Sequence, residues 1–162
     1  MENWCRPVKF FTVDCVKAGK TMTVEKIMSK TVVTVEMDDS LRVVKTIFDN
    51  TRFHHLLVVE AGRLVGVISD RDLLKAVSPN IGTPGETAKD VASLNKRAHQ
   101  IMTRNPVMIR QNAGIFEAIE IFNKQNISCV PVVDDGGKPV GIISWRDILK
   151  ALTKQAKQQG RM

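Results

Sequence analysis

Long apolar runs and paired cysteines are missing from this 162-residue sequence. No apolar run approaches the roughly 18 residues of a membrane span, and the first residues lack the apolar stretch of a signal peptide. We therefore expect a cytoplasmic protein. Cys5, Cys15 and Cys129 contain no Cys-x-x-Cys pair, which excludes a disulfide framework or a thiolate zinc site and predicts reduced thiols.

Signatures of catalysis and of metal binding are also missing. His54, His55 and His99 do not have the spacing of zinc ligands, and neither a nucleophile elbow nor a Ser-His-Asp constellation occurs. We therefore expect no enzyme, no catalytic residue, no catalytic cofactor and no metal. The composition that is present, 43% hydrophobic and 25% charged, is ordinary for a globular protein and excludes disorder.

The net charge of +7 belongs to the two ends of the chain. Residues 1–30 and 150–162 carry an excess of lysine and arginine, whereas residues 31–149 contain equal numbers of basic and acidic side chains. A nucleic-acid domain more often gathers its excess charge on one face of the folded body. The ends are interpreted as solvated tails, with an anion-seeking tail as the alternative.

An internal repeat organises the sequence. The segment Ile27-Met28-Ser29 returns 74 residues later as Ile101-Met102-Thr103, and the motif Gly-h-h-Ser-x-Arg-Asp, where h is apolar, occurs at 66–72 and again at 141–147. Periodicity predicts the same α/β order, β-α-β-β-α, in each copy. The predicted elements are 31–35, 41–48, 56–59, 64–68 and 70–77 in the first copy, and 107–109, 115–122, 129–133, 140–143 and a helix from 145 in the second.

These landmarks predict the domain organisation. We expect the two copies to pack sheet to sheet, because about sixty residues with one exposed sheet face bury too little apolar surface alone. The predicted parts are an N-terminal extension at 1–22, a first repeat at 23–78, a linker at 79–99, a second repeat at 100–153 and a basic tail at 154–162.

The repeated motif stands at a strand-to-helix junction and has two interpretations. Ser69 with Asp72, and Ser144 with Asp147, have the spacing of capping boxes, in which the serine begins the helix and the acid closes the turn. This interpretation explains the serines and aspartates as structural residues.

The cap does not explain the glycines and arginines of the motif. Gly66 and Gly141 interrupt apolar strands, where glycine commonly marks close approach by a ligand or another backbone. Arg71 and Arg146 stand in a first helical turn, where a cation opposes the helix dipole unless an anion lies nearby. A hydroxyl, free N–H groups, an arginine and a carboxylate fit a nucleotide. The residues alone favour neither the cap nor the ligand site.

The doubled motifs, together with residues 127–134 (ISCVPVVD), resemble a pair of cystathionine-β-synthase (CBS) domains, the Bateman module. The resemblance covers residues 23–153. It implies two β-α-β-β-α repeats packed with pseudo-twofold symmetry, two clefts for adenine nucleotides or related adenosyl ligands, and dimerisation. It also implies that the motif aspartate holds ribose hydroxyls and that the motif serine helps to hold phosphate.

Carried over to this sequence, the resemblance implies two ligand-binding sets. The first set is Val67, Ser69, Arg71, Asp72, Thr103, Met108, Ile127 and Ser128. The second set is Ile142, Ser144, Arg146, Asp147, Ser29, Thr34, Phe53, His54 and His55. The sequence departs from the family pattern at Leu57, which replaces the usual proline, and at His54 and His55, which are either phosphate contacts or a simple histidine pair.

The expected function is that of a stand-alone regulatory module for energy sensing, with AMP as the first ligand and ATP, ADP or S-adenosylmethionine behind it. The alternative is a non-catalytic structural or nucleic-acid-associated adaptor with empty clefts. We expect a homodimer, an unknown protein target and no membrane insertion. The predicted dimer residues are Leu73, Leu74, Ile148 and Leu149, and Trp145 is expected to pack across the dimer face or to stack on a base.

Overall fold

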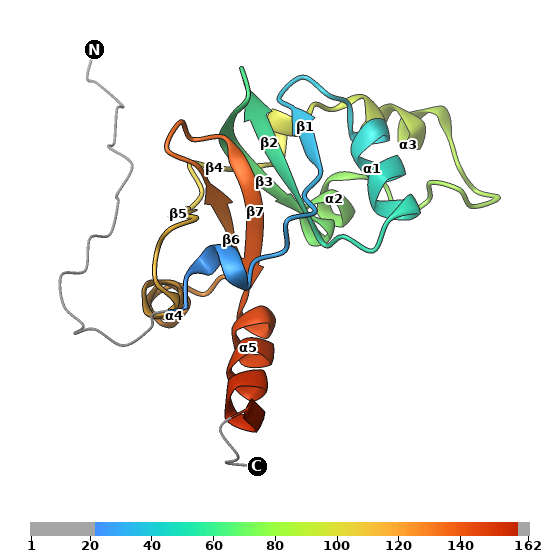
Figure 1. Ribbon diagram of the computed structural model, residues 1–162. Coiled ribbons are helices and arrows are strands. Elements are labelled where there is room, and N and C mark those ends of the chain that lie inside the picture. Colours follow the sequence, from blue (N-terminus) through green and yellow to red (C-terminus); the bar gives the residue numbers. More distant parts are fainter. Residues whose placement is uncertain (1–21, 159–162) are drawn as a thin grey trace. The chain divides into compact units, whose positions relative to one another are not determined.

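The computed structural model describes residues 22–158, so Cys5, Cys15, most of the predicted extension and the end of the basic tail lie outside the described residues. The fold is mixed α/β and forms two compact units (Figure 1). Unit 1 comprises residues 22–31, 107–135 and 140–158, and unit 2 comprises residues 32–106 and 136–139. Each unit therefore combines the main part of one repeat with the opening segment of the other.

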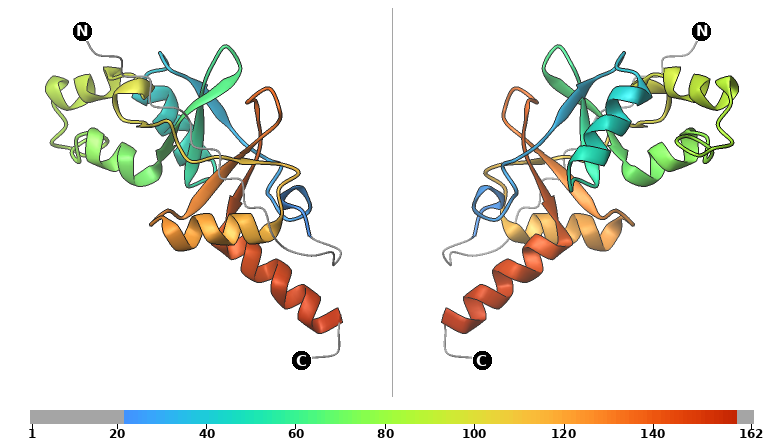
Figure 2. Two further views of the ribbon diagram at one scale, coloured as in Figure 1. Left: turned by 90° about the vertical axis from the view of Figure 1, so that its left-hand side faces the viewer. Right: turned by 90° about the vertical axis from the view of Figure 1, so that its right-hand side faces the viewer.

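Unit 2 contains a four-stranded sheet in the order β1-β2-β3-β4. Strand β1 runs parallel to β2, and the other neighbours are antiparallel. Helices α1 and α2 contact each other (Figure 2). The elements are β1 (Thr34–Glu36), α1 (Leu41–Asn50), β2 (His55–Glu60), β3 (Arg63–Ser69), α2 (Asp70–Ala76), α3 (Ala88–Ala92), η2 (Ser93–Asn95), η3 (Ala98–Gln100) and β4 (Thr103–Arg104).

Unit 1 contains a three-stranded sheet in the order β5-β6-β7, in which β5 runs parallel to β6. Helices α4 and α5 contact each other. The elements are η1 (Val24–Lys26), β5 (Ile109–Arg110), α4 (Ile115–Lys124), β6 (Cys129–Val133), β7 (Pro139–Ser144) and α5 (Trp145–Gln158). The predicted order of elements is thus present in both copies.

The opening segment of each repeat completes the sheet of the other repeat. In unit 2, Thr103 pairs with Val67 at the β3 edge. In unit 1, Ser29 and Ile142 exchange two backbone hydrogen bonds of 2.9 and 3.0 Å. These pairs satisfy backbone groups that a bare strand edge would leave open. The sequence places these segments at the start of their own repeats, and periodicity contains no signal for a partner more than thirty residues away.

Each unit buries its own apolar core. Leu41 and Val44 of α1 lie in the core of unit 2, and Ile115 and Ala118 of α4 lie in the core of unit 1. All four positions belong to the apolar helix faces predicted from the sequence. The amphipathic spacing therefore identifies the buried face correctly in both repeats.

A methionine side chain explains the glycine of each repeated motif. A Cβ built on Gly66 would overlap Sδ of Met102 and lie 2.9 Å from its Cγ. A Cβ on Gly141 would overlap Sδ of Met28 and lie 3.0 Å from both Met28 Cγ and the backbone oxygen of Ser29. Glycine is required here for close packing by a methionine and, at Gly141, for the close approach of another backbone.

The hairpin between β2 and β3 turns through Ala61 and Gly62, which both have positive φ, 48° and 76°. Positive φ at both central positions is the geometry of a type I′ turn, which asparagine tolerates better than alanine. We expect Ala61→Asn to raise the free energy of unfolding by about 0.5–1 kcal/mol. Urea denaturation measures this change, and an unchanged or lower midpoint would contradict it.

The linker between the repeats packs on unit 2. The backbone N–H of Leu41 donates to the carbonyl of Lys96 at 2.8 Å, and Leu94 is buried. Helix α3 begins with its own capping box, formed by Thr87 and Asp90. Hydrogen bonds from Ser78, the larger cause, and from Thr87 lower the pKa of Asp90 to about 2.

No helix in the described residues is long and apolar enough to cross a membrane.

Candidate functional site

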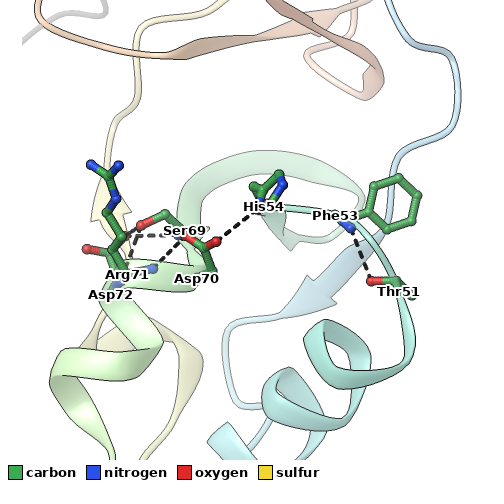
Figure 3. Close-up of polar contacts among 7 residues, drawn as sticks. All are labelled: Thr51, Phe53, His54, Ser69, Asp70, Arg71 and Asp72. Carbon is green, nitrogen blue, oxygen red and sulfur yellow. Dashed lines mark hydrogen bonds and ion pairs between the residues drawn. The ribbon is translucent and has the colours of Figure 1, made fainter.

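In unit 2 the repeated motif forms a capping box at the junction of β3 and α2 (Figure 3). The carboxylate oxygen Oδ2 of Asp72 accepts from the backbone N–H of Ser69 at 2.9 Å and from its hydroxyl at 2.6 Å. The backbone N–H of Asp72 donates to Ser69 Oγ at 3.2 Å. The structural interpretation of this serine and aspartate is therefore confirmed.

Unit 1 repeats this geometry at the junction of β7 and α5. Oδ2 of Asp147 accepts from the backbone N–H of Ser144 at 2.9 Å and from its hydroxyl at 2.6 Å. The backbone N–H of Asp147 donates to Ser144 Oγ at 3.4 Å. Two copies separated by 75 residues thus fix a serine and an aspartate in the same way.

Each capping box uses only one of the two carboxylate oxygens of its aspartate, Oδ2. Among the residues that the structure describes, Oδ1 of Asp72 and Oδ1 of Asp147 accept no hydrogen bond, and both side chains are partly exposed. A carboxylate oxygen has two acceptor positions and can receive sugar hydroxyls. The serine hydroxyls already donate to the aspartates, so a serine must rotate its O–H before it can donate to a phosphate. The cap is therefore compatible with a ligand at Asp Oδ1.

The motif arginines lie on the surface. Both Arg71 and Arg146 are exposed, and the Arg146 guanidinium carbon lies 5.4 Å from the centroid of the Trp145 ring. Trp145 is itself 46% exposed. This cation–π contact stabilises the arginine in the first turn of α5, where the helix dipole opposes it.

The structure brings together parts of each predicted ligand set. Unit 2 contains Val67, Ser69, Arg71, Asp72 and Thr103 of the first set, together with Thr34, Phe53, His54 and His55 of the second. Unit 1 contains Ile142, Ser144, Arg146, Asp147 and Ser29 of the second set, together with Met108, Ile127 and Ser128 of the first. Each unit thus contributes one motif half-site, defined as its Ser-Asp pair with the paired opening segment.

His54 lies beside the motif of its own repeat, which the sequence did not reveal. Its Nδ1 is 2.9 Å from Oδ2 of Asp70, and its backbone oxygen accepts from the N–H of Asp70 at 3.1 Å (Figure 3). The hydrogen bond from the His54 side chain is the main cause that lowers the pKa of Asp70 below its ordinary value. An acid immediately after the motif serine was the available signal, but the partner is 16 residues away in sequence.

His55 gives the folded chain a pH dependence. Burial is the main cause that lowers its pKa from 6.5, so the folded state favours the neutral imidazole. As the pH falls through 6.5, the unfolded chain binds the proton first, and stability is therefore lost below that pH. The lowered pKa of Asp70 acts separately, because its contribution is lost only as the pH falls below 3.8.

We expect the melting temperature to fall between about pH 7.5 and pH 5, and His55→Gln to reduce that fall. A thermal unfolding series measures both slopes. Equal slopes for the wild-type and variant chains would show that His55 does not carry the dependence.

The described residues meet neither the requirements for a reactive thiol nor those for a metal site. Burial raises the pKa of the Cys129 thiol to about 12, so this cysteine is an unreactive part of β6. No group of three or more metal-ligating side chains occurs between residues 22 and 154, the part of the chain whose side chains are described.

Comparison with known proteins identifies related chains. A family model described as CBS domain matches residues 24–79 and 98–154. A CBS domain-containing protein of Dictyostelium discoideum is 33% identical over 133 residues, which cover 81% of this chain and 91% of that protein. Protein MJ1426 of Methanocaldococcus jannaschii is 27% identical over 156 residues, covering 83% and 93%. The chain spans only 46% of a further relative, protein MJ1225 of the same organism.

Solved structures give the same result. The CBS domain pair of protein MJ0100, in complex with 5′-methylthioadenosine and S-adenosyl-L-methionine, has a TM-score of 0.66 and 29% identity, covering 83% of this chain and 98% of that chain. CBSX2 in complex with AMP has a TM-score of 0.66 at 24% identity, covering 82% and 96%, and supports the fold alone.

Proposed function

Because the chain belongs to the CBS domain family, we propose that it binds adenine nucleotides, AMP being the first to test, and regulates a protein partner. The observation that carries this proposal is the duplicated box with its open acceptor. Asp72 Oδ1 and Asp147 Oδ1 are fixed by the same hydrogen bonds in both units and remain available to a ribose. The related CBS pair of MJ0100 binds adenosyl ligands, which supports the same ligand class here.

The chemistry at each half-site is binding and not bond making. The aspartate accepts ribose hydroxyls through Oδ1, while its Oδ2 stays with the serine. The serine turns its hydroxyl from the aspartate toward a ligand phosphate. Ligand binding then stabilises one arrangement of the chain, and a partner that prefers this arrangement binds more tightly.

Ligand screening by thermal shift tests the proposal. AMP, ADP, ATP and S-adenosylmethionine are each added to the full chain, and a ligand that binds only the folded state raises the melting temperature. Mass spectrometry of nucleotides released from the purified protein identifies a ligand that co-purifies. Unchanged melting with every adenosyl ligand would refute the proposal and favour the adaptor function.

Dimerisation remains part of the proposal, with a revised set of residues. Leu73 and Ile148 are core residues, each 5% exposed, whereas Leu74 and Leu149 are 73% and 52% exposed. Only the second pair is available to a partner copy. We expect light scattering at tens of micromolar to show a dimer, and Leu74→Glu/Leu149→Glu to shift it toward the monomer. A wild-type monomer at that concentration would contradict the proposal.

A further inference from the structure

Unit 1 contains a pocket of about 440 Å³ beside Asp147. Asp147 is the one residue of this pocket that belongs to a predicted ligand set. Three lysines and one aspartate are among its lining residues. The lining residues are Met22, Lys26, Ile27, Asp147, Lys150, Ala151 and Lys154.

Helix α5 and the opening segment of the first repeat supply the three lysines of the pocket. Lys150 and Lys154 follow Asp147 at positions three and seven, so α5 presents all three on one face. Lys26 ends η1, which is held to unit 1 by a hydrogen bond of 2.9 Å from the N–H of Val24 to the oxygen of Ala113. Lys26, Lys150 and Lys154 form no ion pair with any residue that the structure describes. The positive charge around the pocket is therefore not neutralised within the described chain.

The repeat supplies a natural comparison, because unit 2 has lysines at only two of the corresponding positions, Lys75 for Lys150 and Lys96 for Met22. The positions that correspond to Lys26 and Lys154 are Gln100 and Pro79. Helix α2 ends at Ala76, whose carbonyl accepts from Lys96 Nζ at 2.7 Å. In unit 1 the longer α5 continues past this point and carries Lys154. The two motifs thus have equal capping boxes and different charge beside them.

We propose that the lysine-lined pocket of unit 1 is an anion subsite that selects phosphate-rich ligands for the Asp147 half-site. This inference rests on the proposed function. The ligand class is a nucleoside triphosphate, whose negative charge the three lysines attract, in preference to S-adenosylmethionine, whose sulfonium is cationic. Salt screens charges over a Debye length of about 8 Å at physiological ionic strength. Because the three lysines line the pocket, their attraction for an anion bound there persists at this salt concentration.

Calorimetry on the full chain tests the inference with four probes: ATP, AMP, S-adenosylmethionine and inorganic tripolyphosphate. We expect Lys150→Gln/Lys154→Gln to weaken ATP and tripolyphosphate about tenfold or more, to weaken AMP less, and not to weaken S-adenosylmethionine. Lys75→Gln is the matched control, because Lys75 corresponds to Lys150 in unit 2. We expect this variant to bind all four probes as the wild-type chain does.

Each outcome separates the inference from the proposed function. Wild-type affinity for ATP and tripolyphosphate in the double lysine variant overturns the anion subsite, while AMP binding by the same protein keeps the proposed function. Lysine-dependent binding of tripolyphosphate without any nucleotide binding supports the subsite and refutes the proposed function. S-adenosylmethionine binding as tightly as ATP in the wild-type chain also overturns the subsite.

Discussion

Replacing Gly141 by alanine should destabilise the protein by about 2 kcal/mol, despite the better intrinsic strand propensity of alanine. The new Cβ overlaps Met28 Sδ and lies 3.0 Å from the backbone oxygen of Ser29, which cannot move without disturbing its pairing with Ile142. Urea denaturation measures the loss. Gly85→Ala is the matched control, because its nearest neighbour would be 3.9 Å away, and we expect it to be nearly neutral.

The corresponding change in unit 2 separates the methionine from the backbone. The three nearest atoms to a Cβ on Gly66 all belong to the Met102 side chain. We therefore expect Met102→Ala to remove much of the cost of Gly66→Ala, with a coupling energy of about 1–2 kcal/mol in a double-mutant cycle. Met28→Ala should relieve Gly141→Ala less, because Ser29 remains. Additive effects at Gly66 and Met102 would contradict the packing explanation.

Replacing Asp147 by alanine should lower nucleotide affinity at its half-site by tenfold or more. Each lost charge-assisted hydrogen bond to a ribose hydroxyl costs about 1.5–3 kcal/mol. The same change removes a helix cap, which costs about 1 kcal/mol of stability. A loss of ligand binding alone could therefore arise from a weakened fold, and a control variant that loses a capping box outside the predicted ligand sets is needed.

Asp90 provides a control for lost stability within the same chain, because its replacement removes a capping box and also the hydrogen bond from the Ser78 hydroxyl. Its Oδ2 accepts from the backbone N–H and the hydroxyl of Thr87 at 2.8 and 2.6 Å, which reproduces the box of Asp72 and Asp147 outside the predicted ligand sets. We expect Asp90→Ala to lower the unfolding midpoint but to leave nucleotide affinity unchanged. Equal losses of affinity in Asp90→Ala and Asp147→Ala would assign the effect to stability and not to the ribose.

Local patterns predicted the local structure well. The apolar spacing at Leu41 and Val44 identified the buried face of α1, and the Ser-x-x-Asp spacing predicted both capping boxes. These features depend on residues within two helical turns of one another, so the sequence contains the whole signal. The cap alternative for the motif was confirmed in this way, while the ribose alternative stays a proposal.

Long-range relations were not readable from the same patterns. The pairing of Ser29 with Ile142 and the hydrogen bond between His54 and Asp70 join segments whose spacing contains no shared period. The motif glycines predicted close approach by a ligand or another backbone, but the methionines that cover them are distant in sequence and were not identified. Edge pairing and side-chain packing of this kind are decided by the tertiary fold.

The central claim is that Asp72 and Asp147 hold the ribose of an adenine nucleotide. Its most direct test is titration calorimetry of AMP into the wild-type chain and into Asp72→Ala/Asp147→Ala. We expect measurable binding to the wild-type chain, and no detectable binding to a double variant that circular dichroism shows to be folded. Undiminished AMP binding by the folded double variant would contradict the ribose role of the duplicated aspartates.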